Sequence, residues 1–305
     1  MASVPASSTR LKFWGTRGSI SVPGPSTLRY GGNTTCLEVR ADGEIIVLDA
    51  GSGIRSLGIA LEKEFRSEPI KLSLLITHAH WDHIQGLPFF APAYEKKNEI
   101  RVRGYDGVDT SFGTIMAEPM KSPFFPIAMR ELSARIDIKK LTEMEFSAGK
   151  VQVRARFVNH PGVCAGYRLF TSAGSIAFVP DHEPYRFLHS AKPNHMSPEE
   201  KKKTAEEERT GLIEFLHGSD VLILDAQYTD TEYESHVGWG HGTASSAVSL
   251  ALDAKVRRLL LFHHDPSHDD TMIDAMVDDA RRLVHDSGKE LEVDAACEGE
   301  EIFLK

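Results

Sequence analysis

Cysteine is scarce in this chain of 305 residues, which contains Cys36, Cys164 and Cys297 and no others. The three cysteines are far apart and odd in number, and none has a second cysteine at the short spacing that zinc sites use. The sequence therefore excludes a small fold stapled by disulfides and favours a reducing compartment with buried thiols. We predict a cytoplasmic protein.

Long apolar runs are also missing. No segment approaches the roughly 20 apolar residues that a membrane-spanning helix needs, so we expect no membrane partner. The first residues lack the apolar centre of a signal peptide, and we interpret 1–9 as a disordered leader.

Positive charge is in deficit, because 44 acidic residues outnumber 35 Lys and Arg and leave a formal net charge of −9. Such a chain is not expected to wrap the phosphate backbone of nucleic acid non-specifically. We therefore expect no extended nucleic acid as a partner. A small anionic substrate stays compatible with this charge, since bound metal ions supply strong local positive charge.

Strands alternate with helices along most of the chain. A hairpin is predicted at 36–49, where Asp42 and Gly43 form a strong turn signal. Apolar residues at helical spacing predict a helix at 54–65. Apolar strands at 72–77, 176–179, 221–224 and 258–262 are followed by polar or helical segments, which indicates a layered α/β core in a single domain over 10–305.

Two segments interrupt this pattern and are predicted to be insertions. Residues 104–130 combine glycine and proline with several Met and Phe side chains. That composition fits a loop packed on the core, a lid over an active site or a dimer contact. Residues 191–210 carry dense mixed charge, which predicts a solvated helix and its entry.

Four metal-binding side chains fall within six residues: His78, His80, Asp82 and His83. They follow a buried apolar strand, which would hold them rigidly. In an extended segment His78 and His80 share one face, and a turn at Trp81 would direct Asp82 and His83 to the other side of the same space. One loop could thus serve two adjacent metal ions, the usual device for a hydrolytic displacement.

Further candidates lie at or just past the ends of other predicted strands, where open α/β sheets assemble their active sites. His160 follows an alternating strand, Asp181 ends a hairpin, and Asp225 ends an apolar strand. A glycine-rich turn before a helix contains His241. The last strand is followed by two histidines, of which His263 is preferred over His264 because it directly continues the strand.

Taken in order, these residues resemble the metallo-β-lactamase-fold hydrolases over nearly the whole chain, with the family's His-x-His-x-Asp-His motif at 78–83. The resemblance implies a four-layer αββα sandwich. It also implies that one metal is held by the first three of the following ligands, the second by the next three, and that the last bridges both: His78, His80, His160, Asp82, His83, His263 and Asp181.

The segments around Asp225 and His241 are similar to the phosphodiesterase branch of this family, which includes phosphoribosyl cyclic phosphodiesterases and transfer-RNA 3′-processing endonucleases. By that resemblance, Asp225 orients His241, which protonates the leaving oxygen. Asp82 and Asp181 would orient a metal-bridging hydroxide. Five histidines and two carboxylates suit two divalent ions, Zn²⁺ or Mn²⁺, with iron as a further option. Arg17, Ser19 and Asn33 are further candidates to face the metals or the substrate.

The predicted reaction is hydrolysis of a small cyclic or linear phosphodiester, such as a cyclic nucleotide or a ribose cyclic phosphate. Transfer-RNA endonucleases carry a long arm between the positions of His160 and Asp181, whereas only twenty residues separate them here. A thioester or other ester hydrolase of the same fold and a non-catalytic metal-binding regulator are the alternatives. A homodimer is left open.

Overall fold

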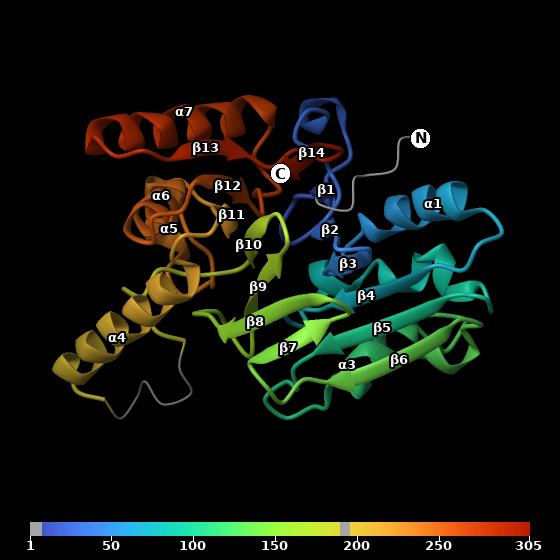
Figure 1. Ribbon diagram of the computed structural model, residues 1–305. Helices are drawn as coiled ribbons and strands as arrows, with labels where there is room; N and C mark the ends of the chain where they lie inside the picture. Colours follow the sequence, from blue (N-terminus) through green and yellow to red (C-terminus); the bar gives the residue numbers. More distant parts are fainter. Residues whose placement is uncertain (1–7, 190–195) are drawn as a thin grey trace. The chain divides into compact units, whose positions relative to one another are not determined.

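The computed structural model describes residues 8–189 and 196–305, which form two compact units (Figure 1). The first unit contains the chain up to Val153, the short stretch Thr171–Gly174 and Cys297–Lys305. The second contains Arg154–Phe170 and Ser175–Ala296. Most of the predicted leader, and the start of the predicted insertion at 191–210, lie outside the described residues. The first strand begins at Thr9.

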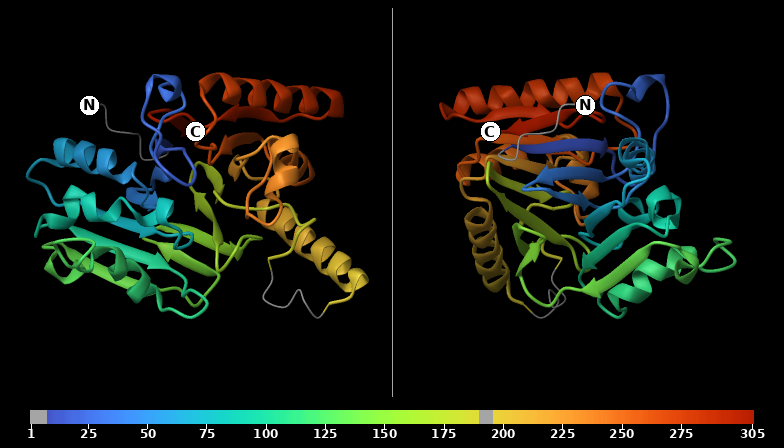
Figure 2. Two further views of the ribbon diagram at one scale, coloured as in Figure 1. Left: turned by 180° about the vertical axis from the view of Figure 1, so that it is seen from behind. Right: turned by 45° about the vertical axis from the view of Figure 1, so that its right-hand side comes forward.

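A mixed sheet forms the frame of the first unit, in the order β14-β1-β2-β3-β4-β5-β6. Pairing from β14 through β3 is antiparallel, and pairing from β3 through β6 is parallel. Figure 2 shows the parallel strands side by side. The strands are β1 (Thr9–Gly15), β2 (Cys36–Ala41), β3 (Glu44–Leu48), β4 (Lys71–Leu75), β5 (Glu99–Gly104), β6 (Arg135–Lys140) and β14 (Glu301–Leu304), and the unit also contains β7 (Glu145–Ala148).

The predicted hairpin is confirmed as β2 and β3, which pair antiparallel. Its turn needs two residues with positive φ, and Asp42 and Gly43 adopt φ of 54° and 86°. Asp-Gly is a favoured pair for such a two-residue turn, because both residues tolerate the left-handed region.

Helix α1 (Ile54–Phe65) confirms the predicted amphipathic helix and buries Ile54, Leu57 and Leu61 in the core of the first unit. The remaining helical segments here are short. They are α2 (Trp81–Ile84), α3 (Phe112–Ala117), and the 3-10 turns η1 (Pro25–Thr27), η2 (Leu87–Phe89), η3 (Ala91–Tyr94), η4 (Glu118–Met120) and η5 (Met129–Glu131).

Residues 104–130 are anchored by their apolar side chains. Phe112, Met116 and Met120 are buried in the core of the first unit. Phe124 is 85% exposed. The segment is therefore anchored on the core through these three side chains, which supports the first of its three predicted roles.

The second unit contains a sheet with β13-β12-β11-β10-β9-β8 as successive neighbours, of which β10 to β13 are parallel. Helix α6 packs on β11 and β12, and α7 lies along β13 (Figure 1). The elements are β8 (Val151–Phe157), which begins in the first unit, β9 (Ala165–Thr171), β10 (Gly174–Val179), α4 (Pro198–Leu216), β11 (Val221–Asp225), α5 (Asp230–His236), α6 (Ala244–Asp253), β12 (Arg258–Phe262), α7 (Asp270–Ser287) and β13 (Glu292–Ala295).

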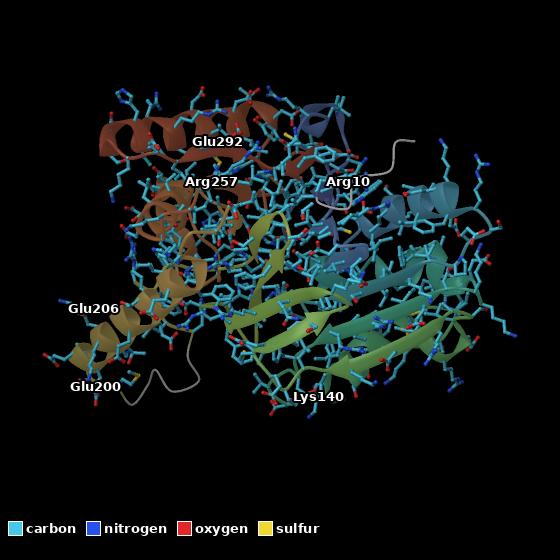
Figure 3. The ribbon with its side chains drawn as sticks, viewed as in Figure 1. Arg10, Lys140, Glu200, Glu206, Arg257 and Glu292 are labelled. Atoms are coloured by element: carbon cyan, nitrogen blue, oxygen red, sulfur yellow. The ribbon has the colours of Figure 1, made fainter. Side chains whose placement is uncertain are left out.

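Helix α4 has the solvated character that its mixed charge predicts. Its start is fixed by a capping box between Ser197 and Glu200. Glu200 and Glu206 extend from it in Figure 3, and Leu212 and Leu216 are the buried residues. None of the helices in the described part of the chain is long and apolar enough to cross a bilayer.

An aromatic pair lies in the core of the second unit. Phe178 of β10 and Phe262 of β12 are fully buried, with ring centroids 5.6 Å apart in an edge-to-face arrangement.

We predict that Phe178→Ala lowers the free energy of unfolding by about 3–5 kcal/mol, because the substitution leaves a cavity that the packed sheet cannot close. Phe157→Ala, at a position that is 43% exposed, is the control and should cost less than half as much. Urea unfolding measures both losses, and equal losses would contradict a stabilising role of the Phe178–Phe262 pair.

Candidate metal and phosphodiester site

The histidine-rich loop follows β4 and ends in the single helical turn α2. His80 lies at the start of that turn, so the chain changes direction at Trp81 as predicted. The ring centroid of His78 lies 4.5 Å from that of His80 and 4.2 Å from that of His83. His78, His83 and Asp82 are buried, whereas His80 is exposed. The loop therefore gathers its histidines into one group.

A buried carboxylate behind this loop fixes the orientation of His83. Asp49 Oδ2 lies 2.8 Å from His83 Nδ1 and also accepts the hydroxyl of Thr77, while Oδ1 accepts the backbone N–H of Thr77. Complete burial raises the pKa of Asp49, and the bonds from His83 and Thr77 oppose the rise. Because Nδ1 is occupied, His83 presents Nε2, which lies 3.3 Å from Asp82 Oδ2. This is the outer-shell arrangement typical of metal-binding histidines.

Asp82 is itself held by backbone. The N–H of Ser19 donates to Asp82 Oδ2 over 2.8 Å, so Ser19 contacts a candidate ligand through its main chain. The other two N-terminal candidates donate hydrogen bonds to further groups. Arg17 is buried and donates to the carbonyl of Gly31, and the Asn33 amide donates to Glu298 Oε1 over 2.6 Å.

In the second unit, three histidines surround Asp181. His263 Nε2 lies 3.4 Å from Asp181 Oδ1, and His160 Nε2 lies 3.6 Å from Oδ2. His241 Nδ1 lies 3.9 Å from the same Oδ2. Asp181, His241 and His263 each offer a donor atom within 4.8 Å of the others. These side chains come from the ends of β8, β10 and β12 and from the turn before α6, as the strand-end pattern predicts.

Outer contacts again decide which ring nitrogen is presented. His160 Nδ1 lies 2.8 Å from the carbonyl oxygen of Gly240, and His263 Nδ1 lies 3.0 Å from Gln227 Oε1. Both oxygens only accept, so Nδ1 carries the proton and Nε2 is the free-electron-pair nitrogen. His264 points away, with Nε2 3.0 Å from the carbonyl of Ala296. The geometry therefore favours His263 over His264 as a ligand.

Asp225 and His241 form a close pair, with Oδ2 2.8 Å from Nδ1. Both residues are buried. The backbone N–H groups of His182 and Gln227 also donate to the Asp225 carboxylate, over 3.0 Å each. The carboxylate is thereby fixed, and it in turn fixes the ring of His241.

Three residues of this site were not among the sequence candidates: Asp49, Gln227 and Glu183. Asp49 and Gln227 follow apolar strands, as the predicted ligands do, so their position carried a signal. Glu183 had none. Burial raises its pKa, but bonds from His189, Gly238, Tyr233 and Gly240 outweigh that effect and hold the pKa below its usual value.

The donor atoms of the candidate ligands are of the types that bind divalent metal ions. The first unit offers imidazoles and the Asp82 carboxylate, and the second offers imidazoles and the Asp181 carboxylate. Nitrogen and oxygen donors of this kind suit Zn²⁺ and Mn²⁺. Ring nitrogens fixed by outer acceptors are expected of metal ligands and are not needed by surface histidines.

Comparison with known families identifies the class of protein. Residues 45–264 match the model of the β-lactamase superfamily domain. This match covers more than half of the chain, which therefore belongs to that superfamily. The predicted family is confirmed.

Individual relatives agree with this assignment. A protein named ribonuclease Z from Haloarcula marismortui is 25% identical over 301 residues, which cover 89% of this chain and 91% of the relative. The metallo-β-lactamase-fold protein YhfI of Bacillus subtilis has a TM-score of 0.65 at 17% identity, covering 97% of this chain and 99% of that one. The short form of human tRNase Z has a TM-score of 0.61 at 18% identity, with the same coverages. The predicted metallo-β-lactamase-type fold is confirmed.

The role of Asp49 can be tested by Asp49→Asn. Asp49 adopts a φ of 62°, which asparagine also tolerates. The change keeps the shape of the side chain but removes the charged acceptor of His83, so we predict a 10- to 100-fold loss of zinc affinity. Asp42→Asn is the matched control, since Asp42 also has positive φ but lies in the β2–β3 turn. Competition with a chromophoric chelator measures both, and equal affinities for the two variants would contradict this role.

Proposed function

We propose that this protein is a dinuclear, zinc- or manganese-dependent phosphodiester hydrolase. The observation that carries the proposal is the Asp225–His241 pair, 2.8 Å apart, beside the carboxylate of Asp181. Simple metal binding needs no such pair. An enzyme that expels an alkoxide does, because the leaving oxygen must be protonated.

The ligand assignment in this proposal rests on the family resemblance. The first three of the following residues would hold one ion, the next three would hold the second, and the last would contribute to both: His78, His80, His160, Asp82, His83, His263 and Asp181. Two such ions supply Lewis-acid charge and an activated water.

The chain's own residues prepare the proton transfer. A carboxylate only accepts hydrogen bonds, so His241 carries a proton on Nδ1 when it faces Asp225. Protonated at Nε2 as well, the ring becomes an imidazolium whose charge the neighbouring carboxylate stabilises. It can then give the Nε2 proton to the departing oxygen. Asp225 fixes the ring by accepting from Nδ1.

The expectation that no extended nucleic acid is a partner is wrong. The chain aligns over 89% of its length with a protein named ribonuclease Z, and it has the fold of a tRNase Z. The net charge was a poor guide to nucleic-acid binding because it sums the charge of the whole protein. A phosphate group interacts with the local charge of metal ions and a few basic side chains. We therefore include RNA in the proposed substrate class.

A small cyclic or linear phosphodiester is the second candidate substrate. Strands β9 and β10 take up most of the twenty residues between His160 and Asp181. That segment is therefore too short to form a long RNA-binding arm as well. A cytoplasmic location and a homodimer stay predictions.

The test is hydrolysis by metal-reconstituted protein of three substrates: bis(p-nitrophenyl) phosphate, a 2′,3′-cyclic nucleotide and a transfer-RNA precursor with a 3′ extension. We predict that Asp82→Ala lowers activity on every substrate that is turned over by more than the 10- to 100-fold typical of an outer-shell change. His241→Ala should cost about 10²–10⁴-fold where an alkoxide leaves.

Exposed His285 provides the matched control, because His285→Ala removes an imidazole from α7 and should leave all rates unchanged. The profile over the three substrates separates an RNA enzyme from an enzyme of small phosphodiesters. Bound metal with no turnover of any of them would overturn the proposal and favour a thioester hydrolase or a metal-binding regulator.

A further inference from the structure

The buried carboxylate of Glu183 is a meeting point of four hydrogen-bond donors. Oε1 accepts the N–H of Gly238 over 2.7 Å and the hydroxyl of Tyr233 over 2.7 Å. Oε2 accepts the N–H of Gly240 over 2.9 Å and lies 2.5 Å from Nε2 of His189. Glu183 has no exposed surface, so solvent cannot replace any of these bonds.

Gly240 connects this carboxylate to two candidate functional histidines. Its N–H donates to Glu183, its carbonyl accepts from His160 Nδ1, and the next residue is His241. Its φ is 95°, and a Cβ at this position would lie 2.5 Å from His160 Nδ1. The backbone here therefore has little conformational freedom. The direction of its peptide groups bears on the orientation of the imidazoles of His160 and His241.

The main chain of Glu183 is fixed as well. Its N–H donates to the carbonyl of Asn159 over 2.8 Å, and the Asn159 amide donates back to the Glu183 carbonyl over 3.0 Å. Asn159 directly precedes His160. The carboxylate thus spans two segments, one carrying His160 and one carrying His241.

We propose that Glu183 is a positioning residue that holds the Gly238–Gly240 backbone and, through it, sets His241 and His160 for phosphodiester cleavage. This inference rests on the proposed function for its catalytic part. It goes beyond the Asp225–His241 pair because it names a second carboxylate that fixes the main chain of the general acid rather than its ring.

Glutamine is the informative replacement. The carboxylate presents acceptors on both sides, with two donors on each oxygen. A glutamine amide keeps the volume but turns one oxygen into a donor, which then faces two donors. Glu183→Gln should therefore displace the glycine backbone without opening a cavity.

The kinetic test compares two substrates at saturating metal. A dinucleoside phosphate releases a ribose alkoxide that needs a proton, whereas bis(p-nitrophenyl) phosphate releases a nitrophenolate that does not. We predict that Glu183→Gln lowers kcat on the first by about 10- to 100-fold, and on the second by less than about threefold, with KM unchanged. Tyr233→Phe, which removes one donor, should give a smaller loss of the same kind.

The control is Glu208→Gln, which removes the charge of an exposed carboxylate paired with Arg156 in the same unit and should change neither rate. A purely structural role for Glu183 would lower both rates together. Equal losses on the two substrates, or no loss, would overturn the inference.

Hydrogen exchange of the Gly238 and Gly240 amides keeps the anchoring testable if the wild type cleaves neither substrate, a result that would count against the proposed function itself. Loss of protection at these amides in Glu183→Gln, with the strands still protected, supports the anchoring. Unchanged protection overturns it.

Discussion

The site depends on hydrogen bonds that link one ring nitrogen of four buried histidines to fixed acceptors. Asp49 takes this role for His83, Gly240 for His160, Gln227 for His263 and Asp225 for His241. An imidazole whose Nδ1 is hydrogen-bonded can present only its Nε2 to a metal ion. Both the tautomer and the orientation of the ring are therefore set before any ion binds. Without these acceptors the same histidines would rotate.

The fold supplies the acceptors because it brings strand ends together. In the second unit β10 to β13 run parallel, so their carboxyl ends meet at one edge, where Asp181, Asp225 and His263 lie. The strands behind them are almost wholly apolar. The rings of Phe178 in β10 and Phe262 in β12 pack edge to face. Rigid strands ending in short polar turns position side chains more firmly than long loops would.

Much of this arrangement could be predicted from the sequence. The apolar strand before His78, the Asp-Gly turn and the strand-end histidines have local signals, and each is found where the pattern places it. Gln227 follows the apolar strand β11, so its position carried a signal, although its pairing with His263 did not. Glu183 could not be predicted, because it accepts hydrogen bonds from groups that are distant in the chain, and a sequence does not show which acidic side chain the fold will place beside them. Glu183 is 55 residues from Gly238, and no periodicity connects them. The expectation that no extended nucleic acid is a partner failed for a related reason, because a net charge does not show where the charges lie.

The most direct test of the metal assignment is anomalous X-ray diffraction from crystals of zinc-loaded protein, with data on both sides of the zinc edge. We predict two anomalous peaks, one coordinated by His160 and the other by His263, with Asp181 in contact with both and Zn–N distances of about 2.0–2.1 Å to the Nε2 atoms. A single peak, or peaks away from these residues, would contradict a dinuclear site built on outer-shell hydrogen bonds.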